Sequence, residues 1–197
     1  MVHLLSNLRQ ASDRIMVRIC VLASKTGLSA GAWTLIGLGF AILSGLTYSN
    51  ILVHSSALAG LLLLLSGFTD MVDGGVARAT NSVSVKGAFL DSTLDRVGEV
   101  FVFAGLLVGN SENQLVVFFA LAFSLTVSYT RSRGESLGVK VEGVGIGERA
   151  DRLLALAVLS IIGYPWIGAT IVLALASITL VQRFFYILSK LPGKQTS

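Results

Sequence analysis

Long apolar stretches alternate with short polar segments along the chain from residue 26 onward. The stretches lie near residues 31–48, 54–79, 84–108, 114–135, 147–163 and 166–188. Their lengths are close to the roughly 20 residues that an α-helix needs to cross a lipid bilayer. The pattern therefore predicts an all-α integral membrane protein in which residues 26–197 form a bundle of six transmembrane helices.

The first 25 residues have a different pattern, in which polar and apolar positions alternate at helical spacing. Arg9, Arg14, Arg18 and Lys25 are interspersed with aliphatic residues, a combination typical of helices that lie on a membrane surface. We expect residues 1–25 to form a juxtamembrane amphipathic helix, and a solvated helix start is the alternative. Together with the bundle, this helix would form a single domain over residues 1–197.

Composition supports a membrane location. Only 13% of the residues are charged and 53% are hydrophobic, whereas soluble domains carry about 25% charged residues. Six helices leave no room for a separate soluble domain, and we expect membrane lipid, and no nucleic acid, as a partner. The one cysteine, Cys20, excludes an internal disulfide.

The basic residues predict how the chain is oriented in the membrane. All 15 lysines and arginines lie in the N-terminal segment, in or near the loops after the second and fourth spans, or at the C-terminus. None lies in the other three turns, and basic loops generally remain on the cytoplasmic side. We therefore expect a multi-pass protein of the cell membrane with both termini, and the acidic cluster described next, on the cytoplasmic side.

Four carboxylates lie in or beside the apolar stretches: Asp70 and Asp73 on one expected helix, and Asp91 and Asp95 on the next. Each carboxylate near the centre of a membrane helix costs roughly 2.5–3.5 kcal/mol on insertion scales, so positive charge has to neutralise them. Residues three or four apart share a helix face, and two facing helices would present all four to one pocket. Such oxygen ligands suit magnesium or manganese. An interhelical salt-bridge network is the alternative, but the only nearby cations are Arg78, Lys86 and Arg96.

The same stretch follows the pattern Asp-x2-Asp-Gly-x2-Ala-Arg-x8-Gly-x3-Asp-x3-Asp without a gap. It resembles the signature of the CDP-alcohol phosphatidyltransferases. The resemblance implies that a CDP-linked lipid gives its phosphatidyl-type group to an alcohol, that CMP leaves, and that the enzyme is a homodimer. It also implies a pair of divalent ions held by Asp70, Asp73, Asp91 and Asp95, with Asp95 as the catalytic base. By the same resemblance, the CDP-lipid is bound by Gly74, Ala77, Arg78, Ser84 and Gly87.

One part of the family pattern is missing. A Pro-Asn or Pro-Asp pair usually precedes the first span, followed by a threonine. Here the corresponding residues 28–34 contain Thr34 but not the pair. Nucleotide or headgroup contacts at residues 29–32 are therefore left open.

A second informative region indicates the acceptor. It reads Ser-Tyr-x-Arg-x-Arg-x-Glu over residues 128–135 and Glu-Arg-x-Asp-Arg over 148–152, and Gln182-Arg183 follows on the last span. Several arginines at one mouth suit a phosphorylated acceptor, because the guanidinium fork binds phosphate through two hydrogen bonds. The segments resemble those of phosphatidylinositol phosphate synthases and archaetidylinositol phosphate synthases. The residue pattern over 128–152 favours the archaeal form. The resemblance implies inositol 1-phosphate as acceptor, its phosphate held by Arg131, Arg133, Arg149, Arg152 and Arg183, with Lys86 as a weaker addition.

Several alternatives stay open at this point. The donor is CDP-archaeol or CDP-diacylglycerol, because a groove for lipid tails needs only apolar side chains. Glycerol 3-phosphate is a second phosphorylated acceptor, and the arginines could also serve as membrane anchors only. A divalent cation transporter would use the carboxylates as an ion site, but it usually has repeated halves, and no repeat is visible in the sequence. A purely structural membrane protein would not explain the buried carboxylates.

Overall fold

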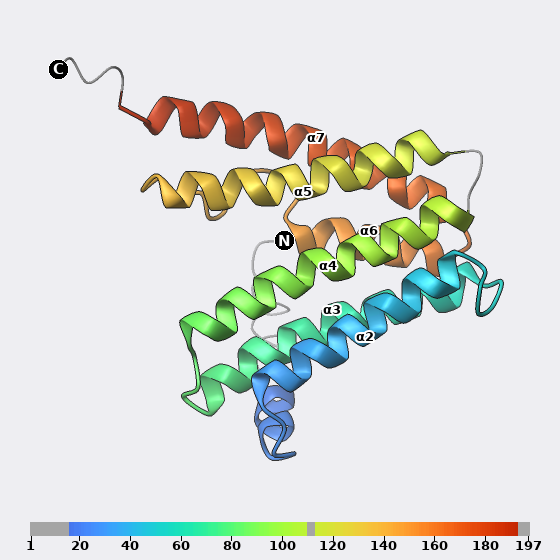
Figure 1. The fold of residues 1–197 in the computed structure, drawn as a ribbon, viewed down its shortest axis with the longest axis horizontal. Helices are drawn as coiled ribbons and strands as arrows, with labels where there is room; N and C mark the ends of the chain where they lie inside the picture. Colours follow the sequence, from blue (N-terminus) through green and yellow to red (C-terminus); the bar gives the residue numbers. More distant parts are fainter. Residues whose placement is uncertain (1–15, 110–112, 193–197) are drawn as a thin grey trace, which may run out of the picture.

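The computed structural model describes residues 16–109 and 113–192, and the regular structure of this part is helical. A short helix over residues 16–24 precedes six longer helices (Figure 1). The longer helices are α2 (Ala30–Tyr48), α3 (Ser56–Ala79), α4 (Val85–Gly109), α5 (Gln114–Ser136), α6 (Arg149–Ile161) and α7 (Pro165–Lys190). Each apolar stretch of the sequence has therefore become one helix, with ends close to those predicted.

Four of these helices, α2, α3, α5 and α7, are long and apolar enough to cross a membrane. The chain is therefore a membrane protein, but by length and composition four helices rather than six qualify as spans. Helix α6 has 13 residues and is about 20 Å long at 1.5 Å per residue, less than the roughly 30 Å of a hydrocarbon core. Helix α4 has 25 residues, but five of them are charged.

Local sequence explains where several helices begin. The side chains of Ser29 and Ser55 each accept a hydrogen bond of 3.2 Å from the backbone N–H three residues on, at the starts of α2 and α3. Glu148 and Asp151 form a reciprocal capping box at the start of α6, which satisfies backbone donors that have no partner within the helix. Pro165 occupies the first turn of α7, where its missing N–H costs nothing.

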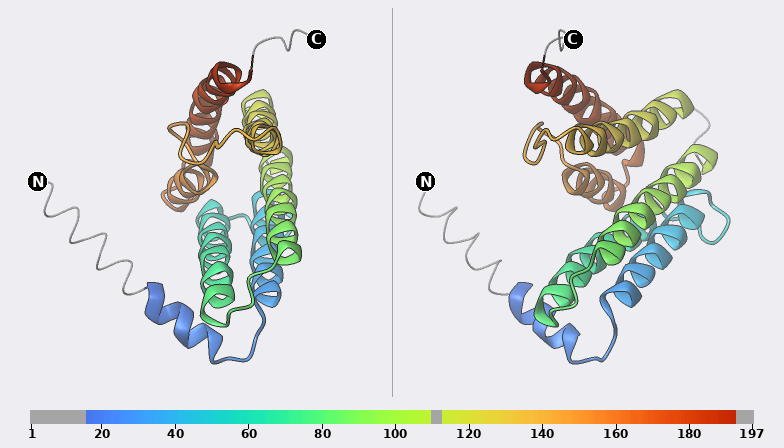
Figure 2. Two further views of the ribbon diagram at one scale, coloured as in Figure 1. Left: turned by 90° about the vertical axis from the view of Figure 1, so that its left-hand side faces the viewer. Right: turned by 60° about the vertical axis from the view of Figure 1, so that its left-hand side comes forward.

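The helices form two groups of three, α2–α4 and α5–α7, and Figure 2 shows the second group above the first. The groups meet where α3 packs on α6 and α4 on α5. Small residues permit close packing: a Cβ on Gly105 of α4 would overlap the carbonyl group of Gly45 in α2, and a Cβ on Gly60 of α3 would meet the Ala157 carbonyl oxygen of α6. Such small residues let the backbones of membrane helices approach one another.

The short helix lies against the C-terminal half of α3. Ala23 packs on Val72 and Val76, Cys20 is buried, and Leu22 on the outer side is exposed. Of the amphipathic helix expected over residues 1–25, residues 1–15 lie outside the described part of the chain. The described residues 16–24 pack against the C-terminal half of α3, which is the half that carries Asp70 and Asp73.

Candidate active site

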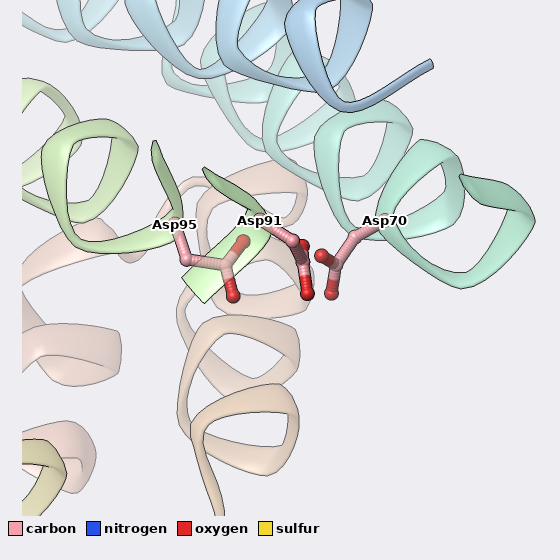
Figure 3. A group of neighbouring side chains, drawn as sticks. All are labelled: Asp70, Asp91 and Asp95. Atoms are coloured by element: carbon pink, nitrogen blue, oxygen red, sulfur yellow. The ribbon is translucent and has the colours of Figure 1, made fainter. Parts of the chain in front are cut away.

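Three carboxylates meet between the C-terminal half of α3 and the N-terminal half of α4. Oxygens of Asp70, Asp91 and Asp95 lie within 4.8 Å of one another, and Figure 3 shows the Asp70 and Asp91 carboxylates turned toward each other with Asp95 beside them. Asp91 and Asp95 are four residues apart and therefore share one face of α4. Three of the four aspartates expected in a metal site are thus brought together.

The carboxylate cluster fits a hard divalent cation. It offers oxygen ligands only, which magnesium and manganese prefer. One oxygen of Asp91, Oδ1, is buried and has no hydrogen-bond partner among the described residues. A buried charged oxygen without a partner is costly, and a cation bound between the three side chains would neutralise it.

Asp73, the fourth expected ligand, does not join this group. Its side chain is buried, and its Oδ2 accepts a hydrogen bond of 2.7 Å from Thr34 Oγ1 of α2. Both residues line a small cavity that also reaches Asp70 and Asp95. Asp73 therefore lies next to the cluster, and Thr34, which did not figure among the predicted site residues, holds its carboxylate.

Two arginines face the cluster from different helices. Arg149 Nη1, on α6, lies 2.5 Å from Asp95 Oδ2 and 3.5 Å from Asp70 Oδ2. Arg96 Nη1, on α4, lies 3.7 Å from Asp95 Oδ2. Asp95 therefore lies near both arginines, whereas Asp70 lies near Arg149 only. Asp95 stands between the carboxylates and the arginines of the site.

A cavity of about 310 Å³ opens on one side of the cluster, between α2, α3 and the start of α4. Asp73 and Asp91 lie in its wall together with Thr34. At Gly87 an added Cβ would lie 3.1 Å from Ser84 Oγ, so glycine leaves this wall open. All five residues predicted to bind the CDP-lipid line this cavity: Gly74, Ala77, Arg78, Ser84 and Gly87. Ala30 and Gly31 also line it, in the segment where the expected Pro-Asn pair is missing.

A second cavity, of about 230 Å³, which we call the arginine cavity, opens on the other side of the cluster, toward α5, α6 and α7. It shares Asp70 and Asp95 with the carboxylate cluster. Four of the five arginines predicted to bind the acceptor phosphate line it: Arg131, Arg149, Arg152 and Arg183. Arg96 lines it as well and was not predicted to belong there.

The two other basic residues predicted to bind the acceptor phosphate, Arg133 and Lys86, do not line this cavity. Arg133 is exposed, does not line the arginine cavity, and lies 3.5 Å from Ser136 Oγ. Lys86 is exposed at the first turn of α4 and lines neither of the two cavities. Helical geometry accounts for Arg133, because residues two apart differ by about 200° around a helix and Arg131 faces the cavity.

The arginines of the cavity differ in how freely they reach it. Arg131 is partly exposed, and its Nε donates to Glu135 Oε1 at 2.9 Å. Arg183 is buried; its Nε donates to the Val144 carbonyl at 2.9 Å and its Nη1 to the Val127 carbonyl at 3.1 Å. These two bonds fix the guanidinium of Arg183 in the cavity wall and leave its Nη2 for a ligand.

The sequence matches the family model of the CDP-alcohol phosphatidyltransferases over residues 28–182, most of the chain. The chain belongs to this family. An archaetidylinositol phosphate synthase of Pyrococcus horikoshii is 32% identical over 182 residues, which cover 92% of this chain and 95% of that protein. A phosphatidylinositol phosphate synthase of Streptomyces avermitilis is 39% identical over 141 residues, which cover 62% of this chain and 58% of that protein.

Solved structures of the phosphatidylinositol phosphate synthase PgsA1 of Mycobacterium tuberculosis share the fold. Its complex with manganese and citrate superposes with a TM-score of 0.78 at 23% identity, covering 92% of this chain and 96% of that chain. The form with CDP-DAG bound gives a TM-score of 0.77 at 24% identity, covering 89% and 94%. PgsA1 therefore has the same arrangement of helices as this chain.

Proposed function

We propose that the protein transfers the phosphatidyl-type group of a CDP-linked lipid to inositol 1-phosphate and releases CMP. The observation that carries the proposal is the pair of cavities that meet at the three-aspartate cluster. One holds the motif residues of the family, and the other is lined by arginines. The relatives are named archaetidylinositol phosphate synthase and phosphatidylinositol phosphate synthase. Both names support inositol phosphate as the acceptor, and they differ in the lipid of the donor.

The cavity of about 310 Å³ is the proposed site of the cytidine diphosphate. Arg78 lies in its wall and would pair with a phosphate or the base, since a guanidinium binds either. Gly74 and Gly87 would let the diphosphate approach the backbone closely, with Ala77 and Ser84 completing the wall. The lipid part would be the isoprenoid ether of CDP-archaeol or the acyl chains of CDP-diacylglycerol, and the bound CDP-DAG of PgsA1 supports a donor of this class.

The cavity of about 230 Å³ is the proposed site of inositol 1-phosphate. Arg149, Arg131 and the free nitrogen of Arg183 would hold the phosphate from three different helices. Five arginines in the wall of one cavity would favour a phosphate monoester over a neutral alcohol there, because guanidinium groups form strong charge-assisted hydrogen bonds with phosphate. Arg133, which also belongs to the predicted set, lies outside this wall.

The chemistry follows from the place of Asp95 between the two cavities. We assign to Asp95 the role of general base: it takes the proton of an inositol hydroxyl, whose oxygen forms a bond to the lipid-bearing phosphorus. The bond from that phosphorus to the bridging oxygen breaks, and CMP leaves with the electron pair. A positioned base of this kind contributes about 10²–10⁴-fold. Arg149, 2.5 Å from Asp95, keeps the carboxylate oriented toward the acceptor side.

The residues proposed to hold the metal are Asp70, Asp91 and Asp95, with Asp73 as a further ligand next to them. We propose Mg²⁺, with Mn²⁺ as a substitute, in a pair of ions; the manganese complex of PgsA1 supports this class of ion. Bound there, divalent ions would neutralise charge on the diphosphate during the transfer. The three carboxylates then serve to bind them and to fix their place between the donor and acceptor cavities.

We further propose that α4 and α6 also lie within the membrane, completing a single six-helix domain whose active site faces the cytoplasm. Four of the five charged residues of α4 fall in its N-terminal half, beside the arginines of α5, α6 and α7. The residues between α2 and α3 and between α6 and α7 contain no lysine or arginine. Such asymmetry is expected when the basic end is cytoplasmic. A homodimer is the expected assembly.

The test is CMP release by the purified protein with a CDP-lipid and Mg²⁺. Four acceptors are compared: inositol 1-phosphate, glycerol 3-phosphate, inositol and serine. We expect release with inositol 1-phosphate and little with the unphosphorylated compounds. Release with glycerol 3-phosphate alone would retain the transfer chemistry and overturn the acceptor assignment. Absence of release with every acceptor, with both donor lipids and with Mn²⁺ as well, would favour the transport alternative.

A further inference from the structure

Glu99 is a buried charge that the proposed reaction does not use. It lies on α4 one turn beyond Asp95, with an exposed fraction of 1%. Neither of its carboxylate oxygens has a hydrogen-bond partner among residues 16–109 and 113–192. Burying such a carboxylate is costly unless an opposite charge lies close by.

The opposite charge is Arg152 of α6, which is also 1% exposed. Its Nη2 lies 3.9 Å from Glu99 Oε1. Its Nη1 donates a hydrogen bond of 2.9 Å to the carbonyl oxygen of Gly147. The guanidinium therefore lies between Glu99 and the loop before α6. Its Nε and Nη2 have no hydrogen-bond partner among the described residues, and Arg152 also forms part of the wall of the arginine cavity.

Gly147 is the point at which this pair reaches the active site. Its carbonyl accepts from Arg152, and its N–H donates to Thr179 Oγ1 of α7 at 3.1 Å. The next residue, Glu148, is the N-cap of α6, and Arg149 begins the helix. Whatever fixes Gly147 therefore fixes the direction in which Arg149 leaves the backbone. Space is tight as well, because a Cβ on Gly147 would lie 2.9 Å from the Cβ of Leu175.

We propose that Glu99 and Arg152 form a positioning pair across the interface of the two helix groups, which holds Gly147 so that Arg149 faces the acceptor phosphate. Arg152 itself does not bind the acceptor phosphate. The proposal rests on the proposed function, in which the arginine cavity holds that phosphate. It assigns different roles to two arginines that are three residues apart in one helix: Arg149 contacts the substrate, and Arg152 acts through Gly147.

A direct phosphate role for Arg152 predicts the opposite response at Glu99. If Arg152 bound the phosphate, removing the neighbouring negative charge would strengthen its attraction for the acceptor. If the two side chains are a positioning pair, removing that charge releases Arg152 from its place and weakens acceptor binding. The sign of the effect of Glu99→Gln on the acceptor KM thus separates the two roles.

The experiment compares Glu99→Gln, Arg152→Gln and the double variant Glu99→Gln/Arg152→Gln. We expect each single variant to raise the KM for inositol 1-phosphate about tenfold or more while the KM for the CDP-lipid stays within about twofold. We expect the double variant to be more stable than the single variants, seen as a higher Tm, because no buried charge is left without its partner. Its KM for inositol 1-phosphate should stay raised, because Gly147 still lacks the hydrogen bond from Arg152.

An unchanged or lower acceptor KM in Glu99→Gln would overturn the proposal. If Glu99→Gln does not fold, Glu99→Asp takes its place, because it keeps the negative charge but shortens the side chain that faces Arg152. A raised acceptor KM in Glu99→Asp supports the positioning pair, and an unchanged acceptor KM overturns it. The wild-type protein serves as the reference, since its failure to release CMP with inositol 1-phosphate would refute the proposed function rather than the role of the pair.

Discussion

Replacing Arg149 by glutamine should separate the acceptor site from the donor site. Arg149 lines the arginine cavity and reaches both Asp95 and Asp70, at 2.5 and 3.5 Å, whereas it does not line the cavity proposed for cytidine diphosphate. A hydrogen bond to a charged group contributes about 1.5–3 kcal/mol, and tenfold corresponds to about 1.4 kcal/mol. We therefore expect Arg149→Gln to raise the KM for inositol 1-phosphate by about 10–150-fold.

The assay measures initial rates of CMP release, first with inositol 1-phosphate varied at saturating CDP-lipid and then with the two reversed. The KM for the CDP-lipid should stay within about threefold of the wild-type value. Lys140→Gln is the matched control, because it also removes one positive charge, from the loop before α6, but its side chain is 84% exposed and its Nζ lies 3.8 Å from Glu142 Oε2. Equal increases in both KM values, or a Lys140→Gln effect as large as that of Arg149→Gln, would refute the assignment of Arg149 to the acceptor.

Three further substitutions test other parts of the site. Asp95→Asn should lower turnover by about 10²–10⁴-fold while Mn²⁺ binding, followed by electron paramagnetic resonance, persists through the other carboxylates; near-full activity would exclude Asp95 as the base. Thr34→Val removes the donor to buried Asp73 and should lower stability by about 1.5–3 kcal/mol, seen as a lower Tm in detergent, whereas Thr34→Ser should retain most of it; equal Tm values for the two variants would contradict this role. Gly87→Val should fill the donor cavity beside Ser84 and raise the KM for the CDP-lipid but not for the acceptor, and a selective effect on the acceptor would reverse the assignment of the two cavities.

The helices were predictable because the apolar stretches are long and several of them begin at residues that favour the start of a helix. Ser29 and Ser55 cap α2 and α3, and Pro165 opens α7, so hydropathy and end signals agree. The number of membrane spans was harder to predict from the sequence. Helix α6 begins at Arg149, directly after its N-cap Glu148, and is therefore too short to cross a bilayer alone. Helix α4 carries five charged residues and is not among the helices apolar enough to count as spans.

The site was predictable where residues depend on helical spacing within one or two helices. Spacing alone groups Asp91 with Asp95, and it also separates Arg131 from Arg133 around α5, a distinction that the motif does not make. Contacts between helices that are far apart in the sequence could not be predicted in this way. The partner of Asp73 is Thr34, 39 residues earlier in the chain.

The buried pair was hidden for the same reason. Glu99 and Arg152 lie on helices of different groups, and the spacing of the sequence motifs does not indicate that these two side chains are buried against each other. Arginines of one short motif therefore look equivalent until packing assigns one to the cavity and another to the interior. Only the fold distinguishes a charge that meets the substrate from a charge that supports the residue doing so.

The central claim is that a phosphate monoester enters the arginine cavity and becomes part of a lipid at the aspartate cluster. The most direct measurement is the transfer of radiolabelled phosphate from inositol 1-phosphate into the lipid fraction by purified protein with a CDP-lipid and Mg²⁺. We predict that the label enters the lipid in a one-to-one ratio with released CMP and that a phosphatase removes it from the product, because it remains a monoester. CMP release without labelled lipid would contradict the account.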